Sequence, residues 1–323
     1  MEPSWTKLPL DIKILIVKPL DRISKINLRQ CSWDDKHLVD SLFTPIKAIY
    51  FVANRSYITI TYDGDLSDFF EIHEEGTAVR RQKYLIPFSR FLVADNFQCV
   101  AWKSLRNMLK SQNNKVDTLH FTFIGSLNFS GEPEPERIVP ELPQETVTVR
   151  EICILGDSTE GINHRIVRFA KPEIEKLTVD VRVVHLSQIS ELGNMEQVRN
   201  VRDLSISVPM KLKQALQLNA TKMTNKSTLF DDEDIIVLLK KSLEKDTPSQ
   251  FNYYRMWPDH NKITSAFNAT LWSPDLYCWY KNPPKVNLTH KNYVLSSVDG
   301  SDEKQIFVAF QRYSVSGFIL KKL

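Results

Sequence analysis

The side chains that could do chemistry in this 323-residue sequence are few and far apart. The four cysteines, Cys31, Cys99, Cys153 and Cys278, form no CxxC pair. None of them has a flanking basic pair or a neighbouring histidine in the sequence to lower the pKa of the thiol and make it a nucleophile. We therefore expect four reduced, mostly buried thiols, which is the usage of a cytosolic or nuclear protein.

Two short segments gather acidic residues. Residues 73–75 read HEE and offer an acid–base pair, but they stand at a predicted strand end, where a solvated loop is the simpler interpretation. Residues 231–234 read DDED and precede Ile235, Leu238 and Leu239 of a predicted helix. Carboxylates at a helix start accept hydrogen bonds from its free N–H groups and favour its dipole. Consecutive helical residues point in different directions, so this run predicts helix capping and no metal site.

The motifs that position phosphates, metals or nucleophiles are missing from the sequence: GxxxxGK[ST], GxGxxG, HExxH and GxSxG. The seven histidines show no ligand spacing, and a formal charge of +3 gives no strong attraction to nucleic acid or to an anionic membrane. No apolar run reaches the roughly 20 residues of a membrane span. We expect no catalytic residues, no metal and no cofactor, although catalytic groups scattered in sequence leave an enzyme open as an alternative.

The first element that the sequence predicts is an apolar helix in the stretch LPLDIKILIVKPLDRISKINLRQCS, residues 8–32. Pro9 stands where a helix begins, and Pro19 ends it because its ring clashes with the preceding turn. Apolar side chains recur at steps of three and four and mark one face of this helix: Leu8, Ile12, Leu15, Ile16 and Leu20.

Two more short helices are expected, one that Asp21 or Ser24 caps and one spanning Trp33–Leu42. Three short helices in about 40 residues are near the lower size limit for independent folding. They carry more large aliphatic side chains than so small a core can cover, and such surplus apolar surface is usually an interface. The alternative is that the helices pack against the rest of the chain.

The segments LPLDI, ILIVKPLD, ISKINLRQCS and HLVDS resemble an F-box over residues 5–42. The form LRQCS followed by VDS is similar to the nematode F-box proteins that carry an FTH or related F-box-associated domain. Trp33 comes one or two places earlier than the tryptophan of some F-boxes and receives no role. The resemblance implies that the residues contacting a Skp-type adaptor are Leu8, Pro9, Ile12, Ile16, Leu20, Ile23 and Leu28.

Strand signals dominate after Pro45. Residues 47–52, 56–62 and 66–73 are β-branched and aromatic runs, and Asp63–Gly64 is a tight-turn dipeptide between the last two. Residues 74–90 are charged and mixed, so we expect a loop there. Further strands begin near residues 116, 148, 174 and 201, with helical segments between them.

This spacing of roughly 25–32 residues is the period of a solenoid, in which each strand–helix unit packs on its neighbours. The strands share an x-L-x-[VIF] pattern without an asparagine ladder, so the array is leucine-rich-repeat-like. The segment LQLN…LFDDEDIIVLLKKSL also resembles the C-terminal third of nematode F-box-associated domains. A hairpin is predicted around residues 298–304. The aromatic segments YYRMWP and LYCWYKNPP either belong to the core or form binding hot spots on the surface.

Together these patterns predict a mixed fold, α+β or α/β, with a three-helix F-box in residues 1–43 and a strand–helix array in residues 44–323. The resemblance implies a non-catalytic substrate-recognition subunit of a Skp–cullin–F-box ubiquitin ligase in the cytoplasm or nucleus. Its partners would be a Skp-type adaptor, cullin through that adaptor, and an unidentified target protein on an unidentified face. The alternative is a non-ligase protein-binding scaffold whose N-terminal helices cap a solenoid.

Overall fold

The computed structural model describes thirteen stretches of the chain: 5–20, 22–42, 46–83, 86–112, 114–125, 146–157, 160–181, 190–226, 230–245, 248–255, 257–272, 291–296 and 304–320. The chain divides into two compact units, Met1–Ile46 and Lys47–Leu323. The predicted mixture of helices with a large sheet is confirmed.

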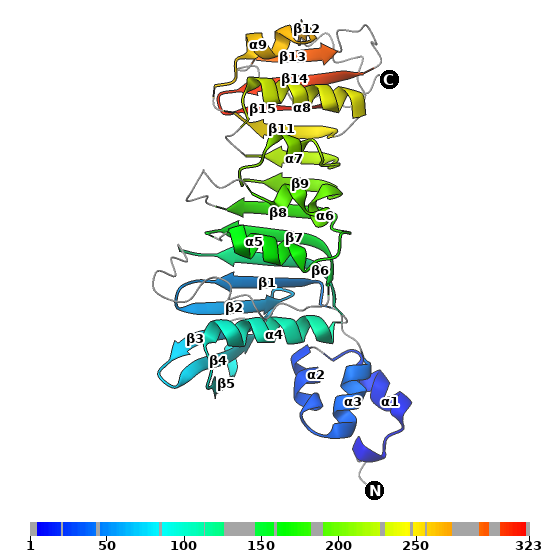
Figure 1. Ribbon diagram of the computed structural model, residues 1–323. Helices are drawn as coiled ribbons and strands as arrows, with labels where there is room; N and C mark the ends of the chain where they lie inside the picture. Colours follow the sequence, from blue (N-terminus) through cyan, green and yellow to red (C-terminus); the bar gives the residue numbers. More distant parts are fainter. Residues whose placement is uncertain are drawn as a thin grey trace. The chain divides into compact units, whose positions relative to one another are not determined.

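The N-terminal unit is helical and lies where the sequence predicts short helices. It comprises η1 (Trp5–Lys7), α1 (Leu10–Val17), α2 (Arg22–Arg29) and α3 (Trp33–Ser41) (Figure 1). Pro9 directly precedes α1, where its missing N–H has no helical partner to lose. Ser32 caps α3 by accepting a hydrogen bond from the N–H of Asp35 at 3.1 Å. Ser24 lies inside α2 and is not its cap.

The second unit is built on strands, with helices between some of them. The helices are α4 (Phe97–Ser111), α5 (Glu160–Arg168), η3 (Leu192–Asn194), α6 (Glu196–Arg199), α7 (Leu212–Ala215), α8 (Asp232–Lys245) and α9 (His260–Ser265). The strands are β1 (Ala48–Ala53), β2 (Tyr57–Tyr62), β3 (Leu66–His73), β4 (Gly76–Lys83), β5 (Ile86–Val93), β6 (Lys115–Phe123), β7 (Thr148–Gly156), β8 (Lys176–Val181), β9 (Asp203–Ile206), β10 (Lys222–Asn225), β11 (Gln250–Tyr254), β12 (Asn268–Leu271), β13 (Lys291–Ser296), β14 (Gln305–Gln311) and β15 (Ser314–Leu320). No helix in the described part of the chain is both long and apolar enough to cross a membrane.

All the described strands join one sheet in the order β12-β13-β14-β15-β11-β10-β9-β8-β7-β6-β1-β2-β3-β4-β5. The central pairs, from β1–β6 through to β10–β11, are parallel. The pairs at the two ends, from β1–β2 to β4–β5 and from β11–β15 to β12–β13, are antiparallel. Helices α5, α6, α7 and α8 alternate with the strands from β7 to β11.

The prediction of a strand–helix array over residues 44–323 was therefore wrong at both ends of the sheet. Antiparallel neighbours need only a short turn, whereas parallel neighbours need a crossover, so the helices are concentrated in the parallel centre. The antiparallel strand pair predicted around residues 298–304 is confirmed, since Ser296 of β13 pairs opposite Gln305 of β14. Residues 297–303 themselves lie outside the described residues. The aromatic segment 276–284 lies outside the described residues.

The prediction of a loop at residues 74–90 was also wrong, because β4 and most of β5 form there. The charges that suggested a loop are neutralised across the strands: Arg81 pairs with Asp68 at 3.0 Å, and Arg80 pairs with Glu71 at 2.9 Å. Gly76 has φ of +133°, and a Cβ there would clash with the carbonyl oxygen of Val93.

One face of the sheet forms the core of the second unit. Trp102 of α4 stacks on Phe51 of β1 and Phe121 of β6, with ring centroids 4.4 Å and 6.1 Å apart. Helices α4 to α8 lie over this face (Figure 1). The aromatic ring of α4 thus packs on β1 and β6, two neighbouring strands that are distant in the sequence.

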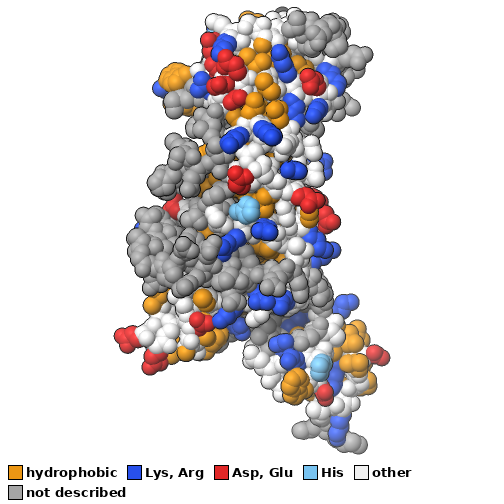
Figure 2. Space-filling view, viewed as in Figure 1, with side chains coloured by type: hydrophobic (Ala, Val, Ile, Leu, Met, Phe, Trp, Pro, Cys, Tyr) orange, Lys and Arg blue, Asp and Glu red, His pale blue; other side chains and the backbone are white. Residues whose placement is uncertain are grey.

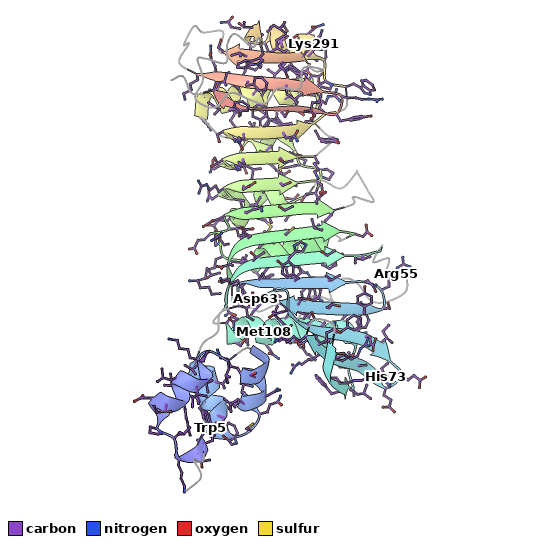
Figure 3. All side chains as sticks on the ribbon, turned by 180° about the vertical axis from the view of Figure 1, so that it is seen from behind. Trp5, Arg55, Asp63, His73, Met108 and Lys291 are labelled. Atoms are coloured by element: carbon purple, nitrogen blue, oxygen red, sulfur yellow. The ribbon has the colours of Figure 1, made fainter. Side chains whose placement is uncertain are left out.

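The opposite face of the central sheet is turned toward the viewer in Figure 3. One row of register neighbours crosses it from β1 to β11: Tyr50, His120, Cys153, Thr178, Ser205, Thr224 and Asn252. These side chains are at least partly exposed. A parallel sheet covered on both faces reads as continuous apolar runs, whereas these strands alternate between buried and part-exposed residues.

Candidate docking surface on the N-terminal helices

Helix α1 exposes most of its aliphatic side chains. Ile12 is 42% exposed, Leu15 67% and Ile16 44%, and their spacing of three and four residues places them on one side of the helix. We name these three residues the α1 patch. Leu10, on another side of the helix, is 62% exposed. Figure 2 shows hydrophobic side chains on the surface of this unit.

The core beneath this surface is small. Within residues 5–42, the only buried aliphatic side chains in the described part are Val17 and Leu38. Asp35 is 5% exposed and accepts hydrogen bonds from the indole N–H of Trp5 at 2.6 Å and the hydroxyl of Ser32 at 2.7 Å. Such charge-assisted bonds fix η1 against the start of α3.

A second polar contact joins α2 to the end of α1. The ammonium of Lys25 donates a hydrogen bond at 3.0 Å to the carbonyl oxygen of Lys18, just beyond α1. The end of a helix leaves carbonyl oxygens without helical partners, and a lysine there satisfies one of them. The helices are therefore held partly by polar contacts, which leaves the aliphatic side chains of α1 free to face outward.

The residues that the resemblance assigns to adaptor contact differ in exposure. Ile12, Ile16 and Pro9 are exposed, whereas Leu8, Leu20 and Leu28 are partly exposed; the side chain of Ile23 lies outside the described part. Exposure by itself identifies no partner.

Sequence reasoning left Leu10 and Leu15 out of this set, although they are the two most exposed aliphatic side chains of α1. The signal was present in LDIKILIV, where six of eight residues are aliphatic. Six such residues cannot all lie on one face of a helix, so some must be exposed unless the helix is surrounded. Trp33, at the start of α3, is 73% exposed, with the ammonium of Lys36 4.6 Å from its ring centroid.

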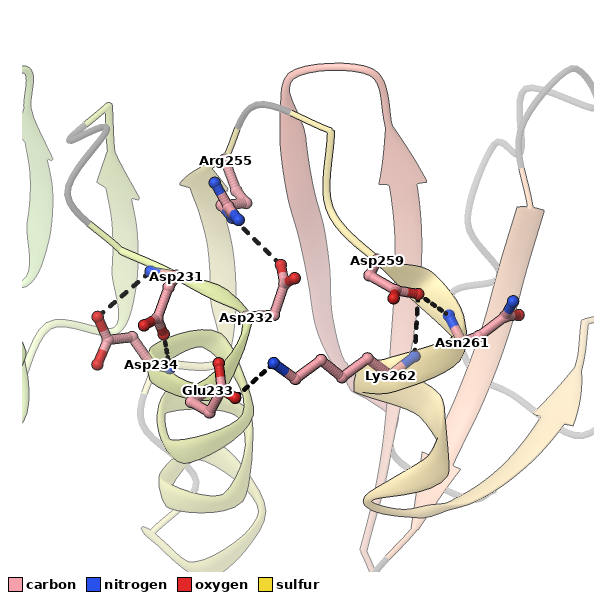
Figure 4. Close-up of polar contacts among 8 residues, drawn as sticks. All are labelled: Asp231, Asp232, Glu233, Asp234, Arg255, Asp259, Asn261 and Lys262. Atoms are coloured by element: carbon pink, nitrogen blue, oxygen red, sulfur yellow. Dashed lines mark hydrogen bonds and ion pairs between the residues drawn. The ribbon is translucent and has the colours of Figure 1, made fainter.

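The acidic run 231–234 caps α8, as predicted (Figure 4). The Asp231 carboxylate accepts from the N–H of Asp234 at 2.8 Å, and the Asp234 carboxylate accepts from the N–H of Asp231 at 3.3 Å. Asp232 pairs with Arg255 at 3.2 Å, and Glu233 pairs with Lys262. The Lys262 ammonium lowers the pKa of Glu233. Among the described residues, no group of three or more His, Cys, Asp or Glu side chains is arranged to hold a metal ion.

The structure places a histidine and a cysteine from different parts of the sequence on neighbouring strands. His120 of β6 and Cys153 of β7 are register partners on the part-exposed face of the sheet. Burial raises the pKa of the Cys153 thiol and lowers that of the His120 imidazole, so both are driven toward their neutral forms. A catalytic thiolate–imidazolium pair requires the opposite shifts, so this pair is not set up as a nucleophile.

The three described cysteines form no disulfide with one another, but the expectation that they are mostly buried was wrong: Cys31 is exposed, and Cys99 and Cys153 are half-buried. Cys278 lies outside the described residues. His73 ends β3 and accepts a hydrogen bond from the N–H of Glu75 at 3.3 Å, which is a local turn contact.

The α1 patch therefore remains the candidate functional site of the N-terminal unit. It consists of three outward aliphatic side chains on a short helix, above a small core and a polar framework. No family model, curated protein or solved structure matches the chain.

Proposed function

We propose that this chain is the substrate-recognition subunit of a Skp–cullin–F-box ubiquitin ligase. The single observation that carries the proposal is the α1 patch, with side chains 42–67% exposed in a compact unit of its own. The patch lies in the segment whose sequence resembles an F-box. The N-terminal helices bind a Skp-type adaptor, and the leucine-rich-repeat-like unit binds a target protein in the cytoplasm or nucleus.

The receptor needs no catalytic residue of its own for protein ubiquitination. It holds the target near a ubiquitin-charged enzyme and raises the effective concentration of target lysines. Docking must therefore be strong enough to keep the assembly together. Complete burial of one fully exposed large aliphatic side chain contributes about 1.5–3 kcal/mol, so burying the three half-exposed residues of the patch supplies about 2–5 kcal/mol of the roughly 8 kcal/mol of micromolar binding.

The proposal is tested by titrating a purified Skp-type adaptor into the full chain by isothermal calorimetry. The variant with Ile12→Asp and Ile16→Asp is expected to bind at least about a hundredfold more weakly, because it loses apolar burial and places two unpaired carboxylates in a desolvated contact. Leu20 is only partly exposed and is a poorer position for a test charge.

The control is Val237→Asp, since Val237 is 39% exposed on α8 and the substitution places one aspartate at a comparably exposed aliphatic position. Its adaptor affinity should equal that of the wild type. Circular dichroism must show equal helix content and equal melting for all three proteins. Absence of wild-type binding, or equal binding by the double variant, contradicts the proposal.

A further inference from the structure

An exposed cluster of two aromatic rings and one arginine lies where β11 ends beside the turn from β14 to β15. We name Trp257, Arg312 and Tyr313 the aromatic–arginine cluster. The Arg312 guanidinium carbon is 4.5 Å from the Trp257 ring centroid and 5.1 Å from that of Tyr313. The two rings meet edge to face at 6.5 Å. Trp257 is 62% exposed and Tyr313 41%.

The backbone holds this cluster in place. The N–H of Trp257 donates to the carbonyl oxygen of Arg312, and the N–H of Arg255 donates to that of Tyr313, both at 3.0 Å. These bonds extend the antiparallel pairing of Tyr254 with Ser314. Trp257 has φ of +54°, a left-handed conformation that a residue with a Cβ rarely adopts. Such strain persists where surrounding contacts enforce it, and binding sites are where it is often found.

The charge of Arg312 is not neutralised by a carboxylate in the described part of the chain. Nearby Arg255 pairs with Asp232 at 3.2 Å, and Lys262 pairs with Glu233 (Figure 4). Arg312 contacts aromatic rings instead. A guanidinium whose face is stacked keeps its planar N–H edge, which matches the two oxygens of a carboxylate.

We propose that the aromatic–arginine cluster is a docking site for an acidic segment of a partner protein. A partner Asp or Glu carboxylate pairs with Arg312, and an adjacent apolar side chain packs on Trp257. Tryptophan, tyrosine and arginine are the residues that most often dominate binding energy at protein interfaces. Recognition of phosphorylated segments typically uses several arginines, and Arg255 is already paired, so the geometry favours a carboxylate.

This site is the target-binding surface of the receptor proposed above. It rests on that proposed function only in that the partner is called a target. The test uses fluorescence anisotropy with the full chain and no adaptor. The probes are a labelled peptide alternating Glu and Leu, its Gln and Leu counterpart, and a counterpart with phosphoserine in place of glutamate. We expect the Glu peptide to bind at least about tenfold more tightly than the Gln peptide.

The variant Arg312→Gln should abolish this preference, and Arg312→Lys should retain only part of it because lysine lacks the planar fork. Arg90→Gln is the matched control: Arg90 is exposed on β5 and forms no ion pair with a described residue. Equal affinity for the Glu and Gln peptides up to about 1 mM overturns the proposal. An unchanged preference in Arg312→Gln, or binding of the phosphoserine peptide alone, also overturns it.

The two proposals fail separately. The variant with Ile12→Asp and Ile16→Asp should bind the Glu peptide like the wild type, because its changes are in the N-terminal unit. Arg312→Gln should bind the adaptor like the wild type. Absence of adaptor binding by the wild type, with its charge-dependent peptide binding intact, would contradict the ligase function alone. Absence of charge-dependent peptide binding by the wild type, with its adaptor binding intact, would contradict the docking site alone.

Discussion

Helices α1 and α8 are both rich in aliphatic residues, yet α1 exposes its side chains and α8 buries them. In α8, Ile235, Leu238, Leu239 and Leu243 are at most 6% exposed. In α1, only Val17 is buried, and Leu15 is 67% exposed. The two helices therefore place similar residues in different surroundings.

The two helices differ in how their aliphatic residues are distributed around the axis and in whether a side chain caps the first turn. The buried aliphatic residues of α8 lie on one face, and most of its other positions carry charged residues. Asp231 caps its first turn, and Asp232 pairs with Arg255 beyond β11. In α1 aliphatic residues surround the helix, and no side chain caps its start. Composition alone thus does not distinguish a buried helix from one with exposed aliphatic side chains, whereas the distribution of residues around the helix does.

The largest expected difference between the two helices is in how much truncation of a leucine lowers the free energy of unfolding. Leu239→Ala should lower the free energy of unfolding by about 2–5 kcal/mol, because it leaves a cavity where the side chain is fully buried. Leu15→Ala removes an exposed side chain and should change it by less than about 0.5 kcal/mol. Urea unfolding measures both values. A loss at Leu15 as large as that at Leu239 would show that α1 is packed against another part of the chain.

A buried charge on α8 provides a second, pH-dependent contrast. Lys241 is 7% exposed and donates hydrogen bonds to the carbonyl oxygens of Leu218 at 2.7 Å and Ala215 at 3.5 Å. Burial lowers its pKa from 10.5 to about 8. Between these pH values the unfolded chain keeps the proton and the folded chain releases it, so the free energy of unfolding rises with pH.

The full rise in the free energy of unfolding that is attributable to Lys241 is on the order of 3 kcal/mol, at about 1.36 kcal/mol per pH unit. Lys241→Met should remove it, which is measured as a flatter profile of unfolding free energy from about pH 8 to 10.5. The neighbouring Lys240 is exposed, and Lys240→Met should keep the wild-type slope. Equal slopes for wild type and Lys241→Met would mean that the ammonium is well solvated.

The smallest expected effect is that of removing residues 1–42. The second unit is compact by itself, so a chain beginning at Phe43 should stay soluble and melt within a few degrees of the full chain. Calorimetry with size-exclusion chromatography checks both properties. Aggregation or unfolding of this shorter chain would favour the alternative in which the N-terminal helices cap the sheet.

Local signals made several elements predictable. Pro9 and Pro19 bracket α1, and the turn at Asp63–Gly64 joins β2 to β3, with positive φ at both turn residues. The starts of the parallel strands β6 to β9 fall within a few residues of the predicted positions. In each case the determining interaction lies within a few residues of the sequence, where periodicity and turn chemistry are informative.

Features that depend on distant partners were not predictable. Arg80 and Arg81 suggested a loop because Glu71 and Asp68, which neutralise them, belong to another strand. Trp257 and Arg312 meet only because β11 pairs with β15. At the candidate site, the apolar content of α1 was evident, but the exposure of Leu15 depends on how few side chains cover the helix.

The parallel centre of the sheet has a consequence for how the chain can change in length. From β7 to β10, each described strand pairs with the strands immediately before and after it in the sequence. If one whole strand–helix unit were inserted or deleted, the remaining strands would still pair parallel with their neighbours in the sequence. Insertions of that size should therefore be tolerated in this region, whereas a shift of a single residue within a strand would reverse its buried and exposed faces.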